Sequence, residues 1–259
     1  MLPRNDLLQG TEHPKMLTRI LDQAEQALKT WEVVQTDFLS PPEVVEVQAR
    51  LARLTELQGV AWGGYPQAER QRFALARAEL PLAPDPVDLT LLAISGNFLF
   101  DPATHRDFLG AILGTGIVRE KVGDILVMGE RGAQAIVIPA IAEFLQQSLT
   151  QVRTVPVKTE ILPWAELRVR EPRTKEITTV EASMRLDAVA SAGFGMSRSK
   201  MGALIGTGDV RVNWKTVTQA SYVVKPGDLV AIRGKGRLTI GEVTLTKKDR
   251  YRMQLTRYY

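Results

Sequence analysis

The middle of the chain constrains the fold most, because strand-like and helix-like patterns alternate there in a definite order. Between residues 87 and 162, short apolar runs typical of strands are separated by two segments with apolar residues at helical spacing. The runs "DILVMG" and "AQAIVIP" are joined by "ERG", which favours a hairpin. The resulting order is strand, helix, strand, strand, helix, strand, and such a segment buries its apolar runs between one sheet and two helices.

This order predicts an α+β protein with a ferredoxin-like (RRM-like) β-α-β-β-α-β middle domain at residues 83–180. RNA recognition by an RRM needs aromatic side chains on the central strands, and neither "DILVMG" nor "AQAIVIP" has one. The segment "GTGIVRE" follows a helix and lacks the third glycine of a dinucleotide-binding loop. His105 and Arg106 begin a predicted helix, where they either meet a phosphate or cap the helix together with Asp107.

The first part of the chain, residues 1–82, is predicted to be a helical domain. Apolar residues recur at helical spacing in 14–31 and 40–57, and a third helix is expected at 65–80, ended by Pro81. Three arginines of this third helix are expected on a solvated face, with a nucleic-acid contact as the alternative: Arg70, Arg72 and Arg77.

Charge is distributed unevenly along the chain. The net charge is +4, but Arg185 to Tyr259 holds 14 Lys and Arg against 5 Asp and Glu, a net charge of +9, so the remainder carries −5. This asymmetry favours a polyanion-binding module at the C-terminal end, with chance clustering on a solvated face as the alternative.

Several function classes are disfavoured by composition. The absence of cysteine excludes disulfides and thiol chemistry, and two distant histidines argue against a histidine metal site or a Ser-His-Asp triad. We therefore expect no catalytic residue, no metal and no cofactor. The chain has no apolar run of the roughly 20 residues that span a membrane, and its first residues are too polar for a signal peptide. A cytoplasmic monomer without a membrane span is expected.

The C-terminal module, residues 181–259, contains a short predicted helix with unusual charges. Ser197 is a suitable N-cap, but Arg198 and Lys200 occupy the first turn, where the helix dipole favours acids. Each such cation costs roughly 0.3–1 kcal/mol unless an anion lies nearby. The sequence thus predicts a phosphate seated on Ser197 to Lys200. The alternative is that both cations extend into water.

The stretch from Arg185 to Asp228, beginning "RLDAVASAGFGMSRSKMGALIGTGDVRVN", resembles the S4-type RNA-binding domain. Its family pattern includes R-L-D, S-R-S, L-I-x-x-G-x-V-x-V-N-G and V-x-x-G-D. Trp214 departs from the usual glycine and either stacks on a base or covers the small core. Asn213 either bonds a ribose hydroxyl or holds the turn. The RNA-binding residues implied are Arg185, Ser197, Arg198, Ser199, Lys200, Arg211, Asn213, Trp214 and Lys215.

The stretch "HRDFLGAILGTGIVREKVGDILV" is similar to the YlmH-like family, whose cyanobacterial and plastid members are called photosystem II S4 domain proteins. The resemblance covers residues 88–243 and implies a three-part protein that binds structured RNA. It further implies ribosomal or transfer RNA on the large ribosomal subunit, translation quality control, and a link to photosynthetic organisms.

Enzymes that carry S4-type domains have further motifs that this sequence lacks. A pseudouridine synthase needs a large catalytic domain, a tyrosyl-tRNA synthetase a HIGH-like motif, and a methyltransferase a glycine-rich cofactor loop. We therefore predict a non-catalytic RNA-binding protein. The alternatives are a small RNA-modifying enzyme and a photosystem II assembly factor.

Two polar segments flank the C-terminal module. Residues 167–183 are interpreted as an extended connection or small hairpin with Pro172 at a turn. The basic end of the chain, residues 244–259, is interpreted as a tail that either extends the RNA contact or is solvated and flexible.

Overall fold

A computed structural model of the chain describes residues 2–169, 173–232 and 234–259. The chain divides into two compact units, Met1–Arg170 and Glu171–Tyr259, which are described separately. Among the described residues, no helix has both the length and the apolar character that crossing a membrane requires.

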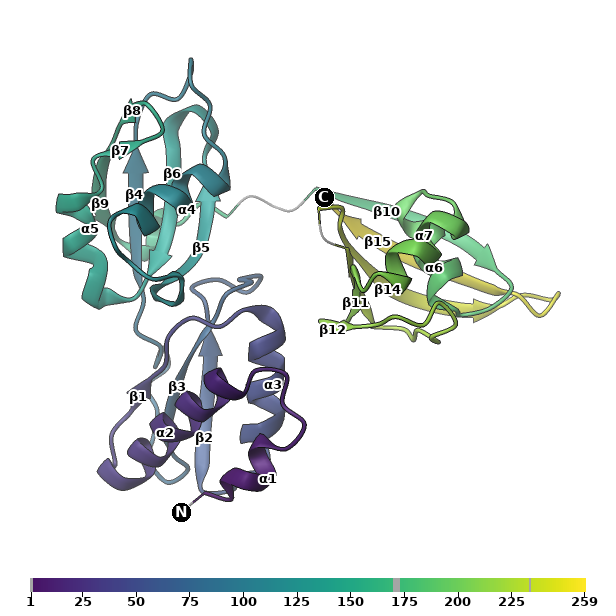
Figure 1. The fold of residues 1–259 in the computed structure, drawn as a ribbon, viewed down its shortest axis with the longest axis horizontal. Coiled ribbons are helices and arrows are strands. Elements are labelled where there is room, and N and C mark those ends of the chain that lie inside the picture. The colour runs from purple at the N-terminus through teal and green to yellow at the C-terminus, as the bar shows by residue number, and fades with distance from the viewer. Residues whose placement is uncertain (1, 170–172, 233) are drawn as a thin grey trace. The chain divides into compact units, whose positions relative to one another are not determined.

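The N-terminal part of the first unit is a small sheet covered by helices (Figure 1). The helices are α1 (Arg4–Leu8), α2 (Pro14–Thr30) and α3 (Pro41–Leu51), and the antiparallel sheet has the order β1 (Val34–Gln35), β3 (Arg72–Arg77), β2 (Leu57–Trp62). Two predicted helices are confirmed, but α3 ends at Leu51, before the predicted end at residue 57, where β2 begins. The three strands show that the prediction of a helical domain at residues 1–82 is wrong. Ser40 begins α3 in a capping box, because the Glu43 carboxylate accepts from the Ser40 N–H at 2.7 Å.

The predicted third helix at residues 65–80 is wrong, because this segment contains the central strand β3. Phe73 to Ala76 are fully buried, so both faces of the strand are covered. A strand buried on both faces has a continuous apolar run, which periodicity does not distinguish from a helix segment. The predicted solvated face is wrong as well. Arg72 is buried and donates to the carbonyls of Thr36 (2.7 Å) and Asp88 (2.6 Å).

The middle part of the first unit has the predicted succession of elements. An antiparallel sheet with the order β5-β6-β4-β9 packs with α4 and α5. A two-stranded hairpin, β7-β8, precedes β9, so the last strand of the predicted order is divided. The bounds are β4 Thr90–Ser95, α4 His105–Gly114, β5 Val122–Val127, β6 Gly132–Val137, α5 Ala142–Ser148, β7 Gln151–Val152, β8 Val155–Pro156 and β9 Lys158–Leu162.

The core of this part lies between its sheet and the two helices. Phe98 and Phe108 are fully buried there, with ring centroids 5.2 Å apart. Helix α4 begins in a capping box: the Asp107 carboxylate accepts from the Thr104 N–H (2.8 Å) and hydroxyl (2.7 Å). This geometry supports helix capping at the start of α4.

The second unit is a six-stranded antiparallel sheet with two short helices, α6 (Leu186–Phe194) and α7 (Arg198–Gly206). Its core includes Leu186, Val189, Met201 and Ile205 from the helices. The strand order is β10 (Thr174–Glu181), β15 (Tyr251–Tyr258), β14 (Gly236–Leu245), β13 (Leu229–Ile232), β11 (Val210–Val212), β12 (Lys215–Thr216).

Two strands of this sheet correct the expectations for the flanking segments. Strand β15 lies between β10 and β14, and its Met253 and Leu255 are fully buried, so the basic end is not a solvated tail. The segment at residues 167–183, expected to be a connection or a small hairpin, contributes strand β10, which pairs with β15 over eight residues. The second unit therefore begins about ten residues before the predicted boundary at 181. The predicted turn at Pro172 lies outside the described residues.

Candidate nucleic-acid interface

The connection between α6 and α7 places the first turn of α7 beside the start of α6. Gly195 ends α6 in the left-handed conformation, with φ of 64°, which glycine adopts without steric cost. Gly193 lies inside α6, where a Cβ would come within 2.3 Å of the Leu238 side chain. Ser197 caps α7 as predicted, and its hydroxyl accepts from the Lys200 N–H at 3.3 Å.

The negative partner at the start of α7 is a carboxylate of the chain itself. Asp187 on α6 is buried, and its Oδ2 accepts from Arg198 Nη2 at 3.1 Å. The same carboxylate accepts from Arg185, through Nε at 3.0 Å and Nη2 at 3.2 Å. Asp187 therefore holds the side chains of Arg185 and Arg198 in place. Because Asp187 supplies a negative charge, Arg198 needs no external anion to offset its position at the start of α7.

The pKa of Asp187 reports the balance of burial and pairing. Burial raises the pKa of this carboxyl, but the hydrogen bonds from Arg185 and Arg198 and the two positive charges outweigh it, so the pKa lies below its ordinary value. Asp187 consequently stays ionised at neutral pH and keeps both guanidinium groups in place.

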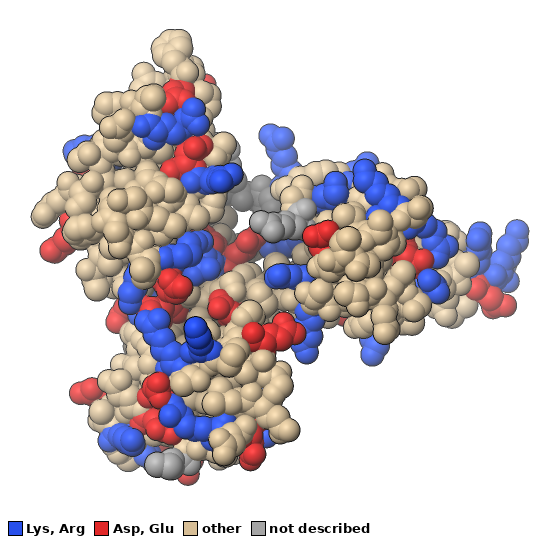
Figure 2. Space-filling view, viewed as in Figure 1, with Lys and Arg blue, Asp and Glu red and all other residues tan. Residues whose placement is uncertain are grey.

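Three of the predicted cations keep their side chains unpaired. Lys200, Arg211 and Lys215 are exposed, and none has a side-chain hydrogen bond or ion pair among the residues that the structure describes. Ser199 is exposed as well. Figure 2 shows Lys and Arg side chains across the face of this unit that carries α6 and α7 in Figure 1.

The sheet does not bring all of these cations together. Val210 and Val212 point into the core, so Arg211 between them points to the opposite face of the sheet. Lys215 is paired with Val212 and therefore lies on the face that carries the helices. Lys200 and Lys215 thus belong to the helix side, and Arg211 does not.

Asn213 holds the turn between β11 and β12. Its Oδ1 accepts from the Leu229 N–H at 2.9 Å, and its Nδ2 donates to Asp228 at 2.8 Å. Asn213 and Trp214 have φ angles of 47° and 68°, the conformation of a tight two-residue hairpin turn. Trp214 is half-buried and is not among the side chains that pack against the described core of this unit. Base stacking on Trp214 stays a prediction.

Sequence reasoning missed the binding partners of three residues of this region. Asp187 and Asp228 lie within the recognised pattern, but the pattern does not show which groups they bind. Asp228 accepts from the Lys225 N–H at 2.7 Å and so closes the "KPGD" turn. Arg257 donates to the Phe194 carbonyl at 3.1 Å and lies over the Phe194 ring, which ties β15 to the end of α6. No group of three or more metal-ligating side chains is found within the described ranges.

Family models match three successive parts of the chain. They are described as "YlmH, N-terminal" (residues 12–80), "Putative RNA-binding domain in YlmH" (84–166) and "S4 domain" (184–230). Fold and matches together define an S4-domain protein with a putative RNA-binding domain ahead of the S4 domain.

The chain belongs to the YlmH family. It is 35% identical over 244 residues to the ribosome-associated protein quality control protein P2 of Bacillus subtilis, a match that covers 90% of this chain and 93% of that protein. It is also 42% identical over 65 residues to the small ribosomal subunit protein uS4 of Thermosipho africanus, covering 25% of this chain and 31% of that protein.

A solved structure shares the fold. The cell division protein ylmH from Streptococcus pneumoniae superposes with a TM-score of 0.52 at 23% identity, covering 61% of this chain and 94% of that chain.

Proposed function

We propose that this protein is a non-catalytic RNA-binding protein that recognises structured RNA, ribosomal or transfer RNA, through its second unit. The observation that carries the proposal is the cationic face around α7, where Asp187 fixes Arg185 and Arg198 beside the unpaired Lys200. Fixed guanidinium groups and free ammonium groups together suit a folded phosphate backbone.

The expected setting is the ribosome. Support comes from the relative in Bacillus subtilis, whose name describes a ribosome-associated quality control protein and which aligns over almost the whole chain. We infer the large ribosomal subunit as the partner and translation quality control as the process. A role in a photosynthetic organism, including photosystem II assembly, has support only in the sequence resemblance.

We also assign the middle part of the first unit to the ferredoxin-like folds. The assignment is supported by its element order and by the strand order β5-β6-β4-β9, in which the first and third strands are central. Strand β5 lies at the edge of this sheet and not at its centre, as the sequence had suggested. The two central strands, β4 and β6, have no aromatic residue, so we expect the sheet to contact RNA by charge and shape rather than by stacking bases.

The test is the salt dependence of binding to purified large ribosomal subunits. Replacing Lys200 or Lys215 by Ala removes one phosphate contact, so each variant is expected to bind more weakly and to reduce the slope of log K against log salt by about 0.7–0.9. Lys29→Ala, which removes an exposed lysine of the first unit, serves as the control and should leave the slope unchanged. Wild-type affinity and slope in both variants would argue against this surface.

The enzyme alternative needs a separate measurement. Ribosomal RNA incubated with the protein is digested and its nucleosides are analysed by mass spectrometry. We expect no protein-dependent change of mass. A modified nucleoside that forms reproducibly contradicts the non-catalytic proposal.

A further inference from the structure

The first unit contains a cleft that the proposed RNA surface does not use. Its volume is about 640 Å³, within the range of small-molecule sites. One wall is helix α2, with Lys15 and Arg19. Arg70 and Arg119 also line it, the latter from the short turn Arg119–Lys121 before β5. The cleft therefore lies where the N-terminal part and the middle part of this unit meet.

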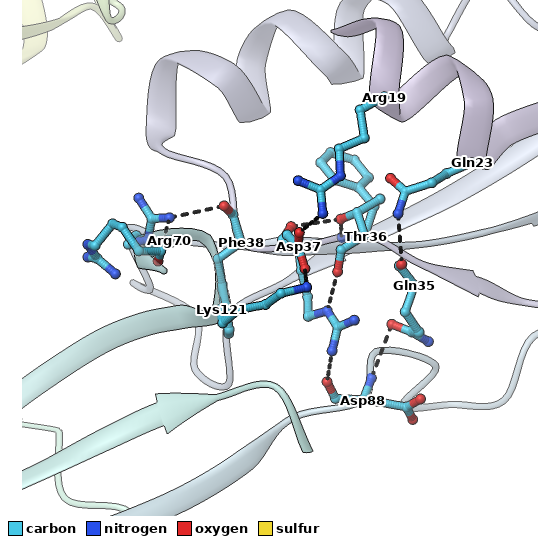
Figure 3. Close-up of polar contacts among 12 residues, drawn as sticks. Arg19, Gln23, Gln35, Thr36, Asp37, Phe38, Arg70, Asp88 and Lys121 are labelled. Atoms are coloured by element: carbon cyan, nitrogen blue, oxygen red, sulfur yellow. Dashed lines mark hydrogen bonds and ion pairs between the residues drawn. The ribbon is translucent and has the colours of Figure 1, made fainter. Parts of the chain in front are cut away.

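Two guanidinium groups meet in this cleft. Arg70 donates through Nε to the carbonyl oxygen of Val122 at 3.0 Å, and Arg119 donates to the same oxygen through Nη1. Arg70 also donates through Nη2 to the Phe38 carbonyl at 3.0 Å, as Figure 3 shows. Because both side chains share one acceptor, their positive charges are held close together.

No carboxylate is paired with either guanidinium within the part of the chain that the structure describes. Asp37 is bound by Arg19 and by Lys121, the latter at 2.6 Å, and Figure 3 shows both contacts. Glu43 is bound by the N-cap Ser40. Glu120 also lines the cleft but forms no ion pair among the described residues.

The positive charges of Arg70 and Arg119 repel each other. Burial, followed by the charge of Arg70, lowers the pKa of Arg119 to about 10, although the negative charges of Asp124 and Glu120 act in the opposite direction. Burial also lowers the pKa of Arg70, against the negative charges of Glu43, Asp124 and Glu120. The carbonyl acceptors leave donors unused: Nη1 of Arg70, and Nε and Nη2 of Arg119, have no hydrogen bond to a described residue. An anion between the two side chains would bind these donors and offset the repulsion.

We propose that this cleft binds a phosphate group between Arg70 and Arg119, with Lys15 as a further contact at its rim. A pair of guanidinium groups matches the oxygen geometry of phosphate, and the exposed Lys15 adds charge without a competing partner among the described residues. The phosphate comes either from an RNA strand or from a free mononucleotide. The proposal does not depend on the RNA surface of the second unit.

The test uses the full chain carrying Lys200→Ala and Lys215→Ala, so that the second unit contributes less to binding. Inorganic phosphate, adenosine 5′-monophosphate and a short single-stranded RNA are titrated by calorimetry. We expect saturable binding of inorganic phosphate, weakened about tenfold by Arg119→Gln, since a hydrogen bond between charged groups is lost. Competition of the monophosphate with inorganic phosphate identifies a mononucleotide site, whereas competition by the RNA alone identifies a strand.

Arg119 also donates to backbone carbonyls, so the folding of the Arg119→Gln variant is checked by thermal melting. Lys15→Gln provides the independent variant, because Lys15 is exposed on α2, and it is expected to weaken phosphate binding about threefold. Lys29→Gln on the same helix, outside the cleft, is the matched control and should bind as the parent does. Absence of phosphate binding at millimolar concentrations, or equal binding by the Lys15 and Lys29 variants, overturns the proposal.

Discussion

At the scale of single residues, Asp187 determines how the cationic surface is presented. The carboxylate accepts hydrogen bonds from Arg185, two positions before it in the chain, and from Arg198, eleven positions after it. Arg198 comes within reach because the left-handed Gly195 reverses the chain between α6 and α7. The sequence pattern predicted that cations at the start of α7 need an anion. It did not identify Asp187, because the contact depends on how the two helices are oriented.

Replacing Asp187 by Asn should destabilise the second unit in a pH-dependent way. A carboxyl whose folded pKa is depressed stabilises the fold above its unfolded pKa of about 3.9, and this contribution is lost as the pH falls through the lower, folded pKa. We expect a loss of about 1–3 kcal/mol at pH 7. Hydrogen exchange of the β11 and β13 amides, measured from pH 7 to pH 3, gives the free energy of opening.

The difference between Asp187→Asn and the wild type should stay constant from pH 7 to about pH 5 and then shrink. Asp209→Asn serves as the control, since Asp209 is exposed and forms no ion pair among the described residues. A difference that does not change with pH would show that the carboxylate charge is not what stabilises this corner.

At the scale of elements, burial decided which sequence predictions failed. Strand β3 was mistaken for a helix because all of its central residues are buried and their apolar run has no clear period. Strand β15 was mistaken for a tail because polar residues alternate with its buried Met253 and Leu255, and basic residues precede and follow them. The strands between Val210 and Leu245 and the helices α2, α4 and α7 were predictable, since their caps, turns and apolar periods agree.

Removing β15 by ending the chain at Thr246 should unfold the second unit. The strand pairs with both β10 and β14, so its loss leaves β10 without a partner and exposes the core around Leu238. In an NMR spectrum of the truncated chain with the first unit still attached, we expect the amide signals of the second unit to collapse to the narrow range of an unfolded chain. The double variant Arg252→Ala, Gln254→Ala changes only exposed side chains of β15 and should keep the native spectrum. Native shifts for α6 and α7 in the truncated chain would contradict a structural role for β15.

At the scale of the whole molecule, the three-part order could be predicted, but the contacts inside the first unit could not. Lys121 from the middle part and Arg19 from α2 both bind Asp37, and Arg70 reaches the Val122 carbonyl across the same junction. None of these pairings has a local sequence signal, because the partners are 18 to 84 positions apart. The N-terminal and middle parts therefore form one compact unit, although each matches its own family model.

Replacing Asp37 by Ala should lower the stability of the first unit alone. Its side chain is 11% exposed and neutralises two cations, so the substitution is expected to cost about 1–3 kcal/mol. Scanning calorimetry of the full chain should show two transitions, with only the one assigned to the first unit moving to lower temperature. Equal shifts of both transitions would contradict the independence of the two units.

The last residue of the chain is hydrogen-bonded to the beginning of the second unit: the Tyr259 N–H donates to the Arg173 carbonyl at 3.1 Å. The first and last described residues of this unit, Arg173 and Tyr259, are thus neighbours at one corner of the sheet. A short peptide between them would allow circular permutation, with new ends opened at the exposed "KPGD" turn. A spin label placed on Tyr259 would report on the point at which the unit is tethered, rather than on its distant rim.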